Sequence, residues 1–207
     1  MRIAVLGGGN GSHAAAADLA EQGHEVRLWR RDARALAPLI ESPRITLVDQ
    51  AGRREVAIDC ATPDAGEPLR GAELVLAPCP AFAQVDLART IAPHLCDGQV
   101  VYLPPGTFGS FAMARTVREA GSGARVAFAE TGTLPYLARK HGPAEVAITT
   151  RATRLPTGVY PAVDSEHPLA RAIVGAARAR ELDVPVASDF SSSPAVGVKA
   201  TVDGIVI

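Results

Sequence analysis

The chain has 207 residues, of which 21 are basic and 22 are acidic, and its formal net charge is -1. This length suits one compact domain with a short appendage, and a hydrophobic fraction of 47 % is enough to bury a core, so global disorder is excluded. The charge balance argues against a nucleic-acid partner. No apolar run approaches the roughly 20 residues that span a bilayer, and the apolar run 3–6 is too short for a signal peptide. We therefore expect a cytoplasmic protein without a membrane partner.

The apolar pattern predicts alternating strands and helices along the first 150 residues. The strands are expected at 2–6, 25–29, 73–77, 99–103, 125–129 and 145–150, the last of these as the final strand of the sheet. The helices are expected at 12–22, 32–40, 82–91 and 111–120, with a short helix or turn at 134–140. Two further strands, 44–48 and 54–58, flank a short turn and predict an inserted β-hairpin.

This alternation predicts an α/β fold, a Rossmann-type doubly wound and mostly parallel sheet with an inserted β-hairpin. We expect residues 1–165 to form the NAD(P)-binding domain. The regularity declines afterwards, so residues 166–207 are expected to form a short irregular C-terminal extension and no full second domain. That extension would contain a helix at 167–180 and, from 182 on, loops with one terminal strand.

A glycine-rich loop follows the first strand. Gly7, Gly9 and Ser12 occupy the three marked places of G-x-G-x-x-G, with Ser in the third. The first place allows a sharp turn, the second leaves room for a pyrophosphate, and the third keeps the helix close to the sheet. The helix start would then present backbone N–H groups to the phosphates. We therefore expect a dinucleotide at this loop, Asn10 and Gly11 included; the alternative is an ordinary glycine-rich turn of an α/β protein.

The end of the second strand reads Trp29-Arg30-Arg31-Asp32, where an NAD-selective domain carries an acidic residue. Arg30 and Arg31 suit a 2′-phosphate, because a guanidinium binds phosphate oxygens through a bidentate fork. The sequence therefore favours NADP over NAD, and Trp29 or an Arg side chain would stack against adenine. The alternative is that both arginines are solvated and Asp32 caps the next helix.

Several segments carry a resemblance to a known family. The opening run 7–20, the run 23–28, the segment 97–106 and above all the segment 129–136 (Ala-Glu-Thr-Gly-Thr-Leu-Pro-Tyr) resemble the octopine/nopaline (opine) dehydrogenases, and 158–162 does so more loosely. The opening alone also fits glycerol-3-phosphate dehydrogenases and ketopantoate reductases. The resemblance covers about residues 1–165. It implies an NAD(P)-dependent oxidoreductase that condenses an amino acid with a 2-oxo acid and reduces the resulting imine.

The carboxyl ends of the strands would line the cofactor crevice. We expect this of five positions: Pro78, Pro104, Gly106, Glu130 and Thr131. Glu130 is also a candidate catalytic carboxylate; its alternative role is to bind backbone amides within a loop. His13 is expected to be a partly exposed residue of the first helical turn.

The opine resemblance also implies a second, mainly helical domain with a catalytic His, but only about forty residues follow position 165. His167, next to Pro168, is expected to be an N-terminal residue of a helix, and the role of that catalytic His is its alternative. The chain would then be truncated, split from a partner or degenerate. We expect a homodimer or a missing second domain or subunit, because an unpaired crevice would expose apolar surface. The competing functions are a non-catalytic NAD(P)-binding module and a reductase like ketopantoate reductase or glycerol-3-phosphate dehydrogenase.

Three cysteines complete the list of reactive side chains. Cys60, Cys79 and Cys96 form no Cys-x-x-Cys pair and have no His at metal-ligand spacing. They predict reduced, mostly buried thiols and no metal site. A nucleophilic role for Cys79 would need a base, and none is near it in the sequence.

Overall fold

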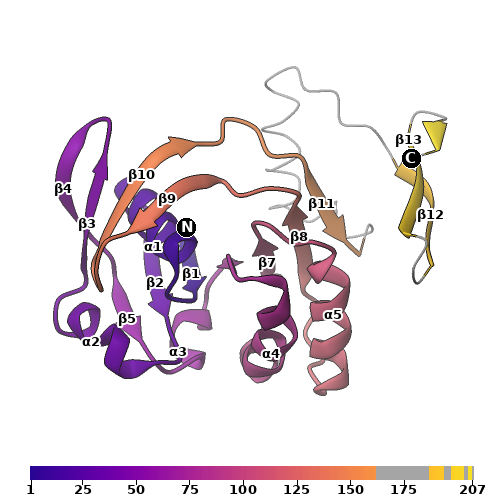
Figure 1. Ribbon diagram of the computed structural model, residues 1–207. Helices are drawn as coiled ribbons and strands as arrows, with labels where there is room; N and C mark the ends of the chain where they lie inside the picture. The colour runs from indigo at the N-terminus through magenta and orange to yellow at the C-terminus, as the bar shows by residue number, and fades with distance from the viewer. Residues whose placement is uncertain (162–186, 194–196, 203–204, 207) are drawn as a thin grey trace. The chain divides into compact units, whose positions relative to one another are not determined.

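The computed structural model describes residues 1–161, 187–193, 197–202 and 205–206 (Figure 1). The chain divides into two compact units, residues 1–165 and 166–207. The elements of the first unit are β1 (Arg2–Leu6), α1 (Asn10–Glu21), β2 (Glu25–Trp29), α2 (Ala33–Glu41), β3 (Arg44–Asp49), β4 (Gly52–Ala57), β5 (Cys60–Thr62), α3 (Gly66–Leu69), β6 (Leu74–Leu76), α4 (Ala81–Ile91), the 3-10 turn η1 (Ala92–His94), β7 (Val100–Leu103), α5 (Gly109–Glu119), β8 (Ala127–Thr131), β9 (Tyr136–Lys140), β10 (Glu145–Arg151) and β11 (Thr157–Tyr160).

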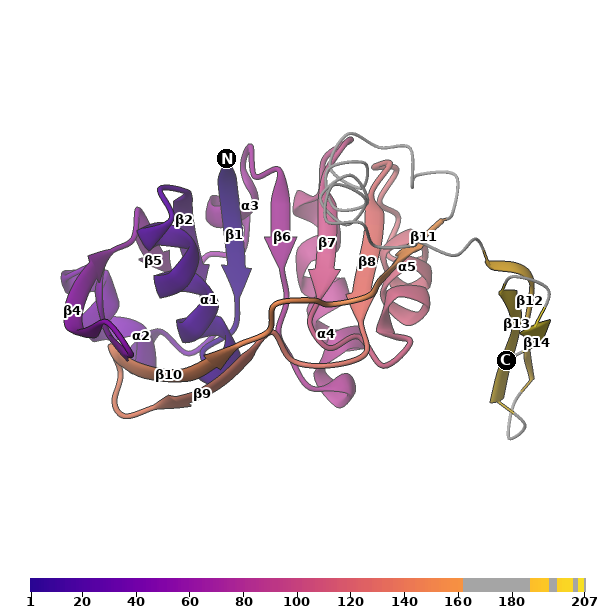
Figure 2. The ribbon, with the colours of Figure 1, turned by 90° about the horizontal axis from the view of Figure 1, so that it is seen from above.

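The central sheet has seven strands in the order β11-β8-β7-β6-β1-β2-β5. All neighbouring pairs are parallel except β11 with β8. Figure 2 shows these strands side by side, with β1 near the middle. The chain moves outward from β1 to β2 and β5 and then returns to β6 on the other side of β1. This reversal places a crevice at the carboxyl ends of β1 and β6, the position where doubly wound sheets bind ligands.

The two faces of the sheet are covered by different elements, so the predicted doubly wound fold is confirmed. One face packs against α4 and α5, with Val75, Val101, Leu87 and Met113 among the buried side chains. The opposite face packs against α1 and α2, whose apolar side chains join those of β1 and β2. The alanines of α1 allow close approach, since Ala14–Ala17 are all at most 1 % exposed.

A second sheet covers the outer side of α1. Its order is β4-β3-β10-β9, with β3 parallel to β10 and the other pairs antiparallel. The predicted hairpin is confirmed as β3 and β4. Two predictions are wrong here: residues 136–140 form a strand rather than a helix or turn, and β10 joins this second sheet rather than ending the central one. The reason is pairing between distant segments, because β10 lies about 100 residues after its partner β3.

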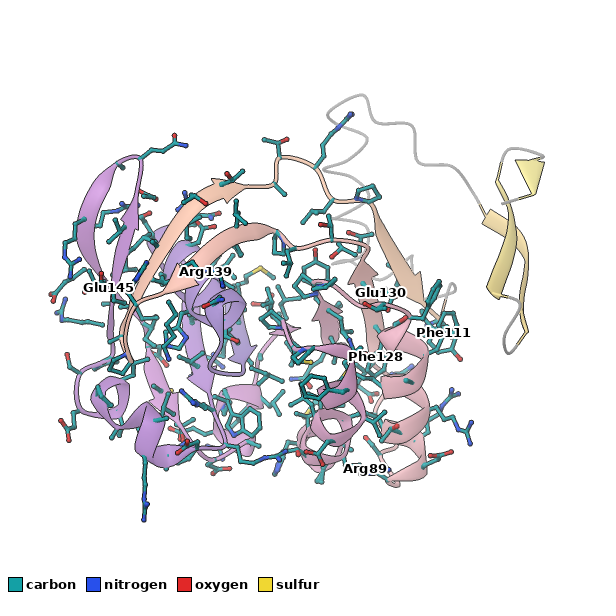
Figure 3. The ribbon with its side chains drawn as sticks, in the orientation of Figure 1. Arg89, Phe111, Phe128, Glu130, Arg139 and Glu145 are labelled. Atoms are coloured by element: carbon teal, nitrogen blue, oxygen red, sulfur yellow. The ribbon has the colours of Figure 1, made fainter. Side chains whose placement is uncertain are left out.

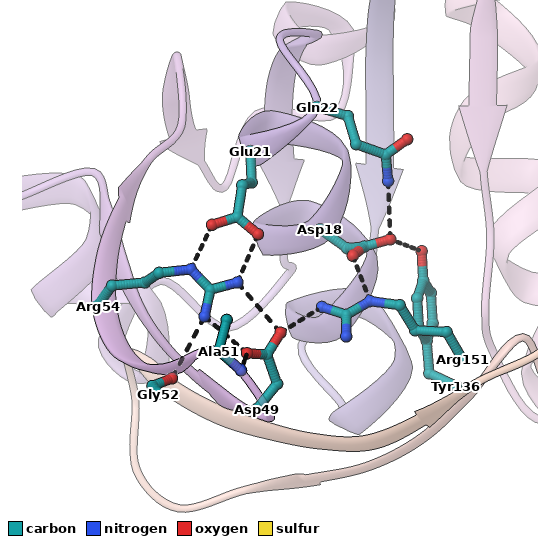
Figure 4. Close-up of polar contacts among 9 residues, drawn as sticks. All are labelled: Asp18, Glu21, Gln22, Asp49, Ala51, Gly52, Arg54, Tyr136 and Arg151. Carbon is teal, nitrogen blue, oxygen red and sulfur yellow. Dashed lines mark hydrogen bonds and ion pairs between the residues drawn. The ribbon is translucent and has the colours of Figure 1, made fainter.

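Ion pairs fasten this second sheet to α1 (Figure 4). Arg151 of β10 donates to Asp18 of α1 at 2.6 Å and to Asp49 of β3 at 2.7 Å. Arg54 of β4 donates to Asp49 at 2.7 Å and also contacts Glu21 of α1. The Tyr136 hydroxyl of β9 donates to Asp18 at 3.0 Å. All four strands of the second sheet thus contribute to one network that ends on the first helix.

The C-terminal unit contains a small antiparallel sheet in the order β12-β13-β14, formed by β12 (Ala187–Ser193), β13 (Gly197–Val202) and β14 (Ile205–Val206). The sequence predicts loops with one terminal strand from residue 182 on. One strand is expected and three form, because each strand pairs with its neighbour in this small sheet. The predicted helix 167–180 and the candidate His167 lie outside the described residues.

Candidate functional site

The glycine loop turns sharply at Gly7, which has a φ of +112°. Its N–H donates to the carbonyl of Trp29 at 2.7 Å, so the loop is joined to the end of β2. Ser12 lies beneath the turn, and its hydroxyl donates to the carbonyl of Leu6 at 3.2 Å. A Cβ on Gly7 would lie 2.8 Å from the Ser12 Oγ. The residue in the third marked place therefore binds helix α1 to strand β1, while glycine in the first place allows the contact.

The start of α1 faces open space. Gly9 is its N-cap, with φ -87° and ψ -172°; no side chain caps the helix, and its first turn contains no acidic residue. A Cβ built on Gly9 would have no neighbour within 4 Å. A helix start without an anionic side chain leaves backbone N–H groups and a partial positive charge available to an anion. The arrangement is a cradle that fits a diphosphate and that a side chain at position 9 would fill.

A groove of about 290 Å³ begins beside the loop. Its walls include Leu6 and Trp29 from the ends of β1 and β2, Leu87 of α4 and the side chain of Arg30. Trp29 is 5 % exposed, and its indole N–H donates to the carbonyl of Pro63 at 3.0 Å, which fixes the ring within the wall. The groove thus combines apolar walls, which suit a base and a ribose, with a cation at its rim, which suits a phosphate.

The two arginines after β2 have different surroundings. The side chain of Arg30 lies over Gly8, since a Cβ built there would be 2.7 Å from the Arg30 Nε. Arg31 points to α4 instead, where it pairs with Asp86 at 2.7 Å and donates to the Thr90 hydroxyl at 3.3 Å. Asp32 accepts the N–H of Ala35 at 3.1 Å and caps α2, as the alternative interpretation of this segment holds. Only Arg30 is directed at the glycine loop.

The second sheet brings residues to the loop that the sequence did not single out. The Nζ of Lys140 donates to the carbonyl of Gly8 at 3.3 Å, and its backbone N–H donates to the Oδ1 of Asn10 at 3.0 Å. Nothing local predicts this contact; the one sequence signal is that Lys140 is one of two lysines among 21 basic residues.

His13 is 1 % exposed, so its prediction as a partly exposed residue is wrong. The second sheet covers it: Nε2 lies 2.9 Å from the carbonyl of Pro143, and Nδ1 lies 3.1 Å from that of Gly9. Burial is the main cause that lowers the pKa of this imidazole, and the Lys140 charge lowers it further. His13 therefore ties the β9–β10 turn to the glycine loop.

The strand ends on the other side of the crevice form a second connected group around Glu130, which Figure 3 labels near α5. The carboxylate of Glu130 accepts the N–H groups of Phe108 at 3.0 Å and Ser110 at 2.8 Å, at the start of α5. The N–H of Gly106 donates to the carbonyl of Thr131 at 3.0 Å. Both oxygens of Glu130 are thus used in holding the 106–110 loop, in which Phe108 has a left-handed φ of +61°. This geometry supports the loop-holding role of Glu130 over a catalytic one.

The remaining predicted residues also have definite positions. Pro78 follows β6 and packs on the glycine loop, because a Cβ on Gly11 would lie 3.1 Å from the Pro78 Cβ. Pro104 is buried at the end of β7. Cys60 and Cys79 are half-buried and Cys96 is exposed, so the prediction of mostly buried thiols is wrong. Partial burial still raises the pKa of the Cys79 thiol to about 11, which opposes a nucleophilic role. Within the described ranges, no cluster of three His, Cys, Asp or Glu residues could hold a metal, and no helix is long and apolar enough to cross a membrane.

Sequence comparison gives relatives among dehydrogenases. The chain is 38 % identical over 107 residues to a glycerol-3-phosphate dehydrogenase (NAD(P)+) of Nitratidesulfovibrio vulgaris (strain DP4). The matched segment covers 49 % of this chain and 30 % of that protein. It is 33 % identical over 102 residues to an opine dehydrogenase of Arthrobacter sp. (strain 1C), covering 49 % of this chain and 28 % of the relative. The chain therefore matches less than a third of the length of these curated relatives.

Solved structures share the fold at low sequence identity. An octopine dehydrogenase in complex with NADH and agmatine superposes with a TM-score of 0.65 at 23 % identity, covering 76 % of this chain and 41 % of that one. A PanE/ApbA family ketopantoate reductase from Ralstonia eutropha JMP134 superposes with a TM-score of 0.60 at 24 % identity, covering 86 % of this chain and 54 % of that one. A yersinopine dehydrogenase with NADP+ bound superposes with a TM-score of 0.63 at 16 % identity, covering 84 % of this chain and 45 % of that one. These similarities confirm the Rossmann-type fold.

The family assignment comes from the sequence profile described as "Ketopantoate reductase PanE/ApbA", which matches residues 3–153. The resemblance to opine dehydrogenases holds in part, because an opine dehydrogenase is one relative among others. Glycerol-3-phosphate dehydrogenases and ketopantoate reductases, which the opening run also fits, match as well. Since the match spans well over half of the 207 residues, the chain belongs to the ketopantoate reductase PanE/ApbA family.

Proposed function

We propose that this chain binds NADP in preference to NAD and serves as the cofactor-binding part of an oxidoreductase. The observation that carries the proposal is the start of α1, where the N-cap Gly9 has open space above it and neither a capping side chain nor a first-turn acid competes for an anion. The diphosphate would lie on Gly9, Asn10, Gly11 and Ser12, below the turn at Gly7. The adenosine would occupy the neighbouring groove between Trp29 and α4.

The nicotinamide end would extend toward the second group of strand-end residues, Pro78, Pro104, Gly106, Glu130 and Thr131. A bound nicotinamide supplies a hydride to the carbon of a C=O or C=N group. A proton must reach the oxygen or nitrogen, and Glu130 holds two backbone N–H groups instead. We infer that Glu130 shapes the floor of the crevice and that the proton donor is a different group.

The substrate class follows from the relatives. The family description names ketopantoate reductase, and the titles of two similar structures name L-arginine and pyruvate as ligands of octopine dehydrogenase. Ketopantoate and pyruvate are both small 2-oxo acids, a class that the glycerol-3-phosphate dehydrogenases among the relatives do not share. We propose this class for the present protein.

A variant of Gly9 tests the proposal without disturbing the fold. Gly9→Ala should fold normally, because its φ of -87° suits alanine and a Cβ meets no atom within 4 Å. The substitution should lower the affinities for NADPH and NADH about tenfold or more, since the Cβ fills the diphosphate cradle. Calorimetric titration measures both affinities. Gly123→Ala is the matched control. A Cβ at position 123 also meets no atom within 4 Å, and this position is more than 100 residues from the glycine loop in the sequence.

Turnover distinguishes the enzyme from the non-catalytic module, which is the second candidate function. NADPH oxidation is followed with ketopantoate alone and with pairs of an amino acid and a 2-oxo acid. Binding without oxidation of NADPH by any of these substrates supports the module, which the engagement of both Glu130 oxygens favours. If wild-type protein binds neither coenzyme while Gly9→Ala and wild type melt at the same temperature, the proposal is wrong.

Apolar side chains at the carboxyl end of the sheet support self-association. Phe82 at the start of α4 is 88 % exposed, and Phe108, Leu134 and Leu137 are also exposed. We infer that this edge contacts a second copy of the chain. Light scattering at micromolar concentration should give the mass of a dimer, and a monodisperse monomer would contradict the inference.

A further inference from the structure

Two cations converge on Gly8, the middle residue of the glycine loop. The Nζ of Lys140 is 3.3 Å from the Gly8 carbonyl oxygen. The guanidinium of Arg30 covers the Cα of the same residue, since a Cβ built on Gly8 would lie 2.7 Å from its Nε and 3.0 Å from its Cζ. The two side chains come from β9 and from the end of β2, which belong to different sheets.

Little negative charge balances this pair. Among the described residues, no carboxylate lies within ion-pair distance of Lys140, and the ion pair of Arg30, with Asp32, has a separation of 4.0 Å. Burial lowers the pKa of the Lys140 ammonium, and the positive charge of Arg30 lowers it further. Two like charges held together in a partly desolvated position repel each other, so an anion bound between them would relieve an existing strain.

The backbone of Lys140 is held in place. Its N–H donates to Asn10 at 3.0 Å, and the turn that follows it is joined to the loop through His13, 2.9 Å from the carbonyl of Pro143. The same hairpin is joined to α1 by Tyr136 through Asp18. The ammonium therefore does not depend on a mobile backbone, and little ordering of the main chain would be needed to bind an anion.

Arg31, the other cation expected to select the phosphate, also lines the groove, but its guanidinium is ion-paired there. It pairs with Asp86 at 2.7 Å and donates to Thr90 at 3.3 Å on the exposed face of α4. Its charge is thus compensated, whereas that of Lys140 is not. In a Rossmann domain the substituent on the ribose C2′ is recognised at the end of β2, which is where Arg30 lies.

We propose that Lys140 and Arg30 together bind the 2′-phosphate of NADP, and that Lys140 rather than Arg31 is the second cation that selects NADP over NAD. This inference rests on the proposed function, since it assigns a further residue to the same cofactor site. An ammonium and a guanidinium on a doubly charged phosphate form charge-assisted hydrogen bonds, which are about twice as strong as neutral ones.

The test measures NADPH and NADH affinities of the full chain by calorimetry for wild type, Lys140→Met, Lys140→Arg and Arg31→Met. Lys140→Met should lower the affinity for NADPH about tenfold and the affinity for NADH less than twofold, because only NADPH carries the 2′-phosphate. Lys140→Arg should recover most of the NADPH affinity, and Arg31→Met should lower the NADPH affinity less than Lys140→Met does, because its guanidinium is already paired with Asp86. Equal losses for both coenzymes in Lys140→Met, no loss at all, or a larger loss in Arg31→Met would each overturn the proposal.

A measurement on the wild-type protein covers the case in which Lys140→Met does not fold. Lys140 and Lys199 are the two lysines of the chain, and mass spectrometry of peptides follows their acetylation by an amine-reactive ester. Adenosine 2′,5′-bisphosphate should slow the acetylation of Lys140 more than 5′-AMP does, with Lys199 as the internal reference. Equal protection by both nucleotides would overturn the proposal, whereas failure of wild type to bind either coenzyme would instead refute the proposed function.

Discussion

Asp49 is the centre of the network that holds the second sheet against α1, and its removal should destabilise the protein strongly. Its side chain is 4 % exposed. The carboxylate accepts hydrogen bonds from Arg54 at 2.7 and 3.1 Å, from Arg151 at 2.7 Å and from the N–H of Ala51 at 2.9 Å. Asp49→Ala removes all four and leaves two arginines without their shared partner.

The magnitude follows from what the arginines retain. A hydrogen bond to a charged group contributes about 1.5–3 kcal/mol, but Arg54 still contacts Glu21, and Arg151 still contacts Asp18. Both arginine side chains are also about a third exposed, so water replaces part of the loss. We therefore expect a decrease of about 2–4 kcal/mol in the free energy of unfolding, less than the sum of the individual bonds. For a domain of this size that corresponds to a decrease of roughly 5–15 °C in Tm.

Urea unfolding followed by circular dichroism measures the change, with an unchanged slope as the sign that the unfolded state is the same. Glu119→Ala is the control, because its ion pair with Arg115 lies on the exposed surface of α5, and its unfolding midpoint should match wild type. An Asp49→Ala midpoint equal to that of Glu119→Ala would refute the reasoning. The network would then contribute no more than a surface ion pair.

The remaining predictions concern the buried His13 and the half-buried Cys79. Because burial lowers the pKa of His13 in the folded state, the unfolded chain binds more protons below pH about 6.5, and the free energy of unfolding should fall between pH 7.5 and 5. His13→Gln should flatten this dependence in urea titrations, His24→Gln should not, and equal slopes in all three proteins would contradict the assignment. For the cysteines, burial raises the pKa of Cys79 to about 11, so iodoacetamide at pH 8 should label the exposed Cys96 well before Cys79. Peptide mass spectrometry measures the order, and equal labelling rates would show that the Cys79 thiol is accessible.

Local sequence signals predicted those parts of the fold that are built from neighbouring segments. The strand-turn-helix opening has an apolar run, glycines and a helix-forming Ala14–Ala17 stretch within twenty residues, and it is confirmed as β1 and α1. The hairpin 44–57 is also local, since its two strands pair directly across a short turn. The alternative role of Asp32 as the cap of α2 follows the same logic, because the carboxylate accepts the N–H of Ala35, three residues along the chain.

Contacts between distant segments could not be predicted in this way. The run 136–140 has no strong strand pattern of its own, and it becomes a strand because β10 pairs with it and Tyr136 packs against α1. His13 has an ordinary first-turn position in the sequence, and its burial comes from Pro143, 130 residues later. The same holds for Lys140, which reaches Gly8 across 132 residues. No periodicity or motif spacing encodes such a separation.

The two parts of the proposed cofactor site depend on different kinds of contact. The diphosphate cradle is local, formed by Gly7 to Ser12, so its properties should depend little on the second sheet. The 2′-phosphate pair is not local, because Lys140 is positioned by the sheet that Asp49 fastens to α1. A folded protein with a loosened second sheet should therefore keep much of its affinity for NADH while losing affinity for NADPH. Asp49→Ala, titrated below its melting temperature, should show this selective loss, and a parallel loss of both coenzymes would mean that the second sheet supports the cradle itself.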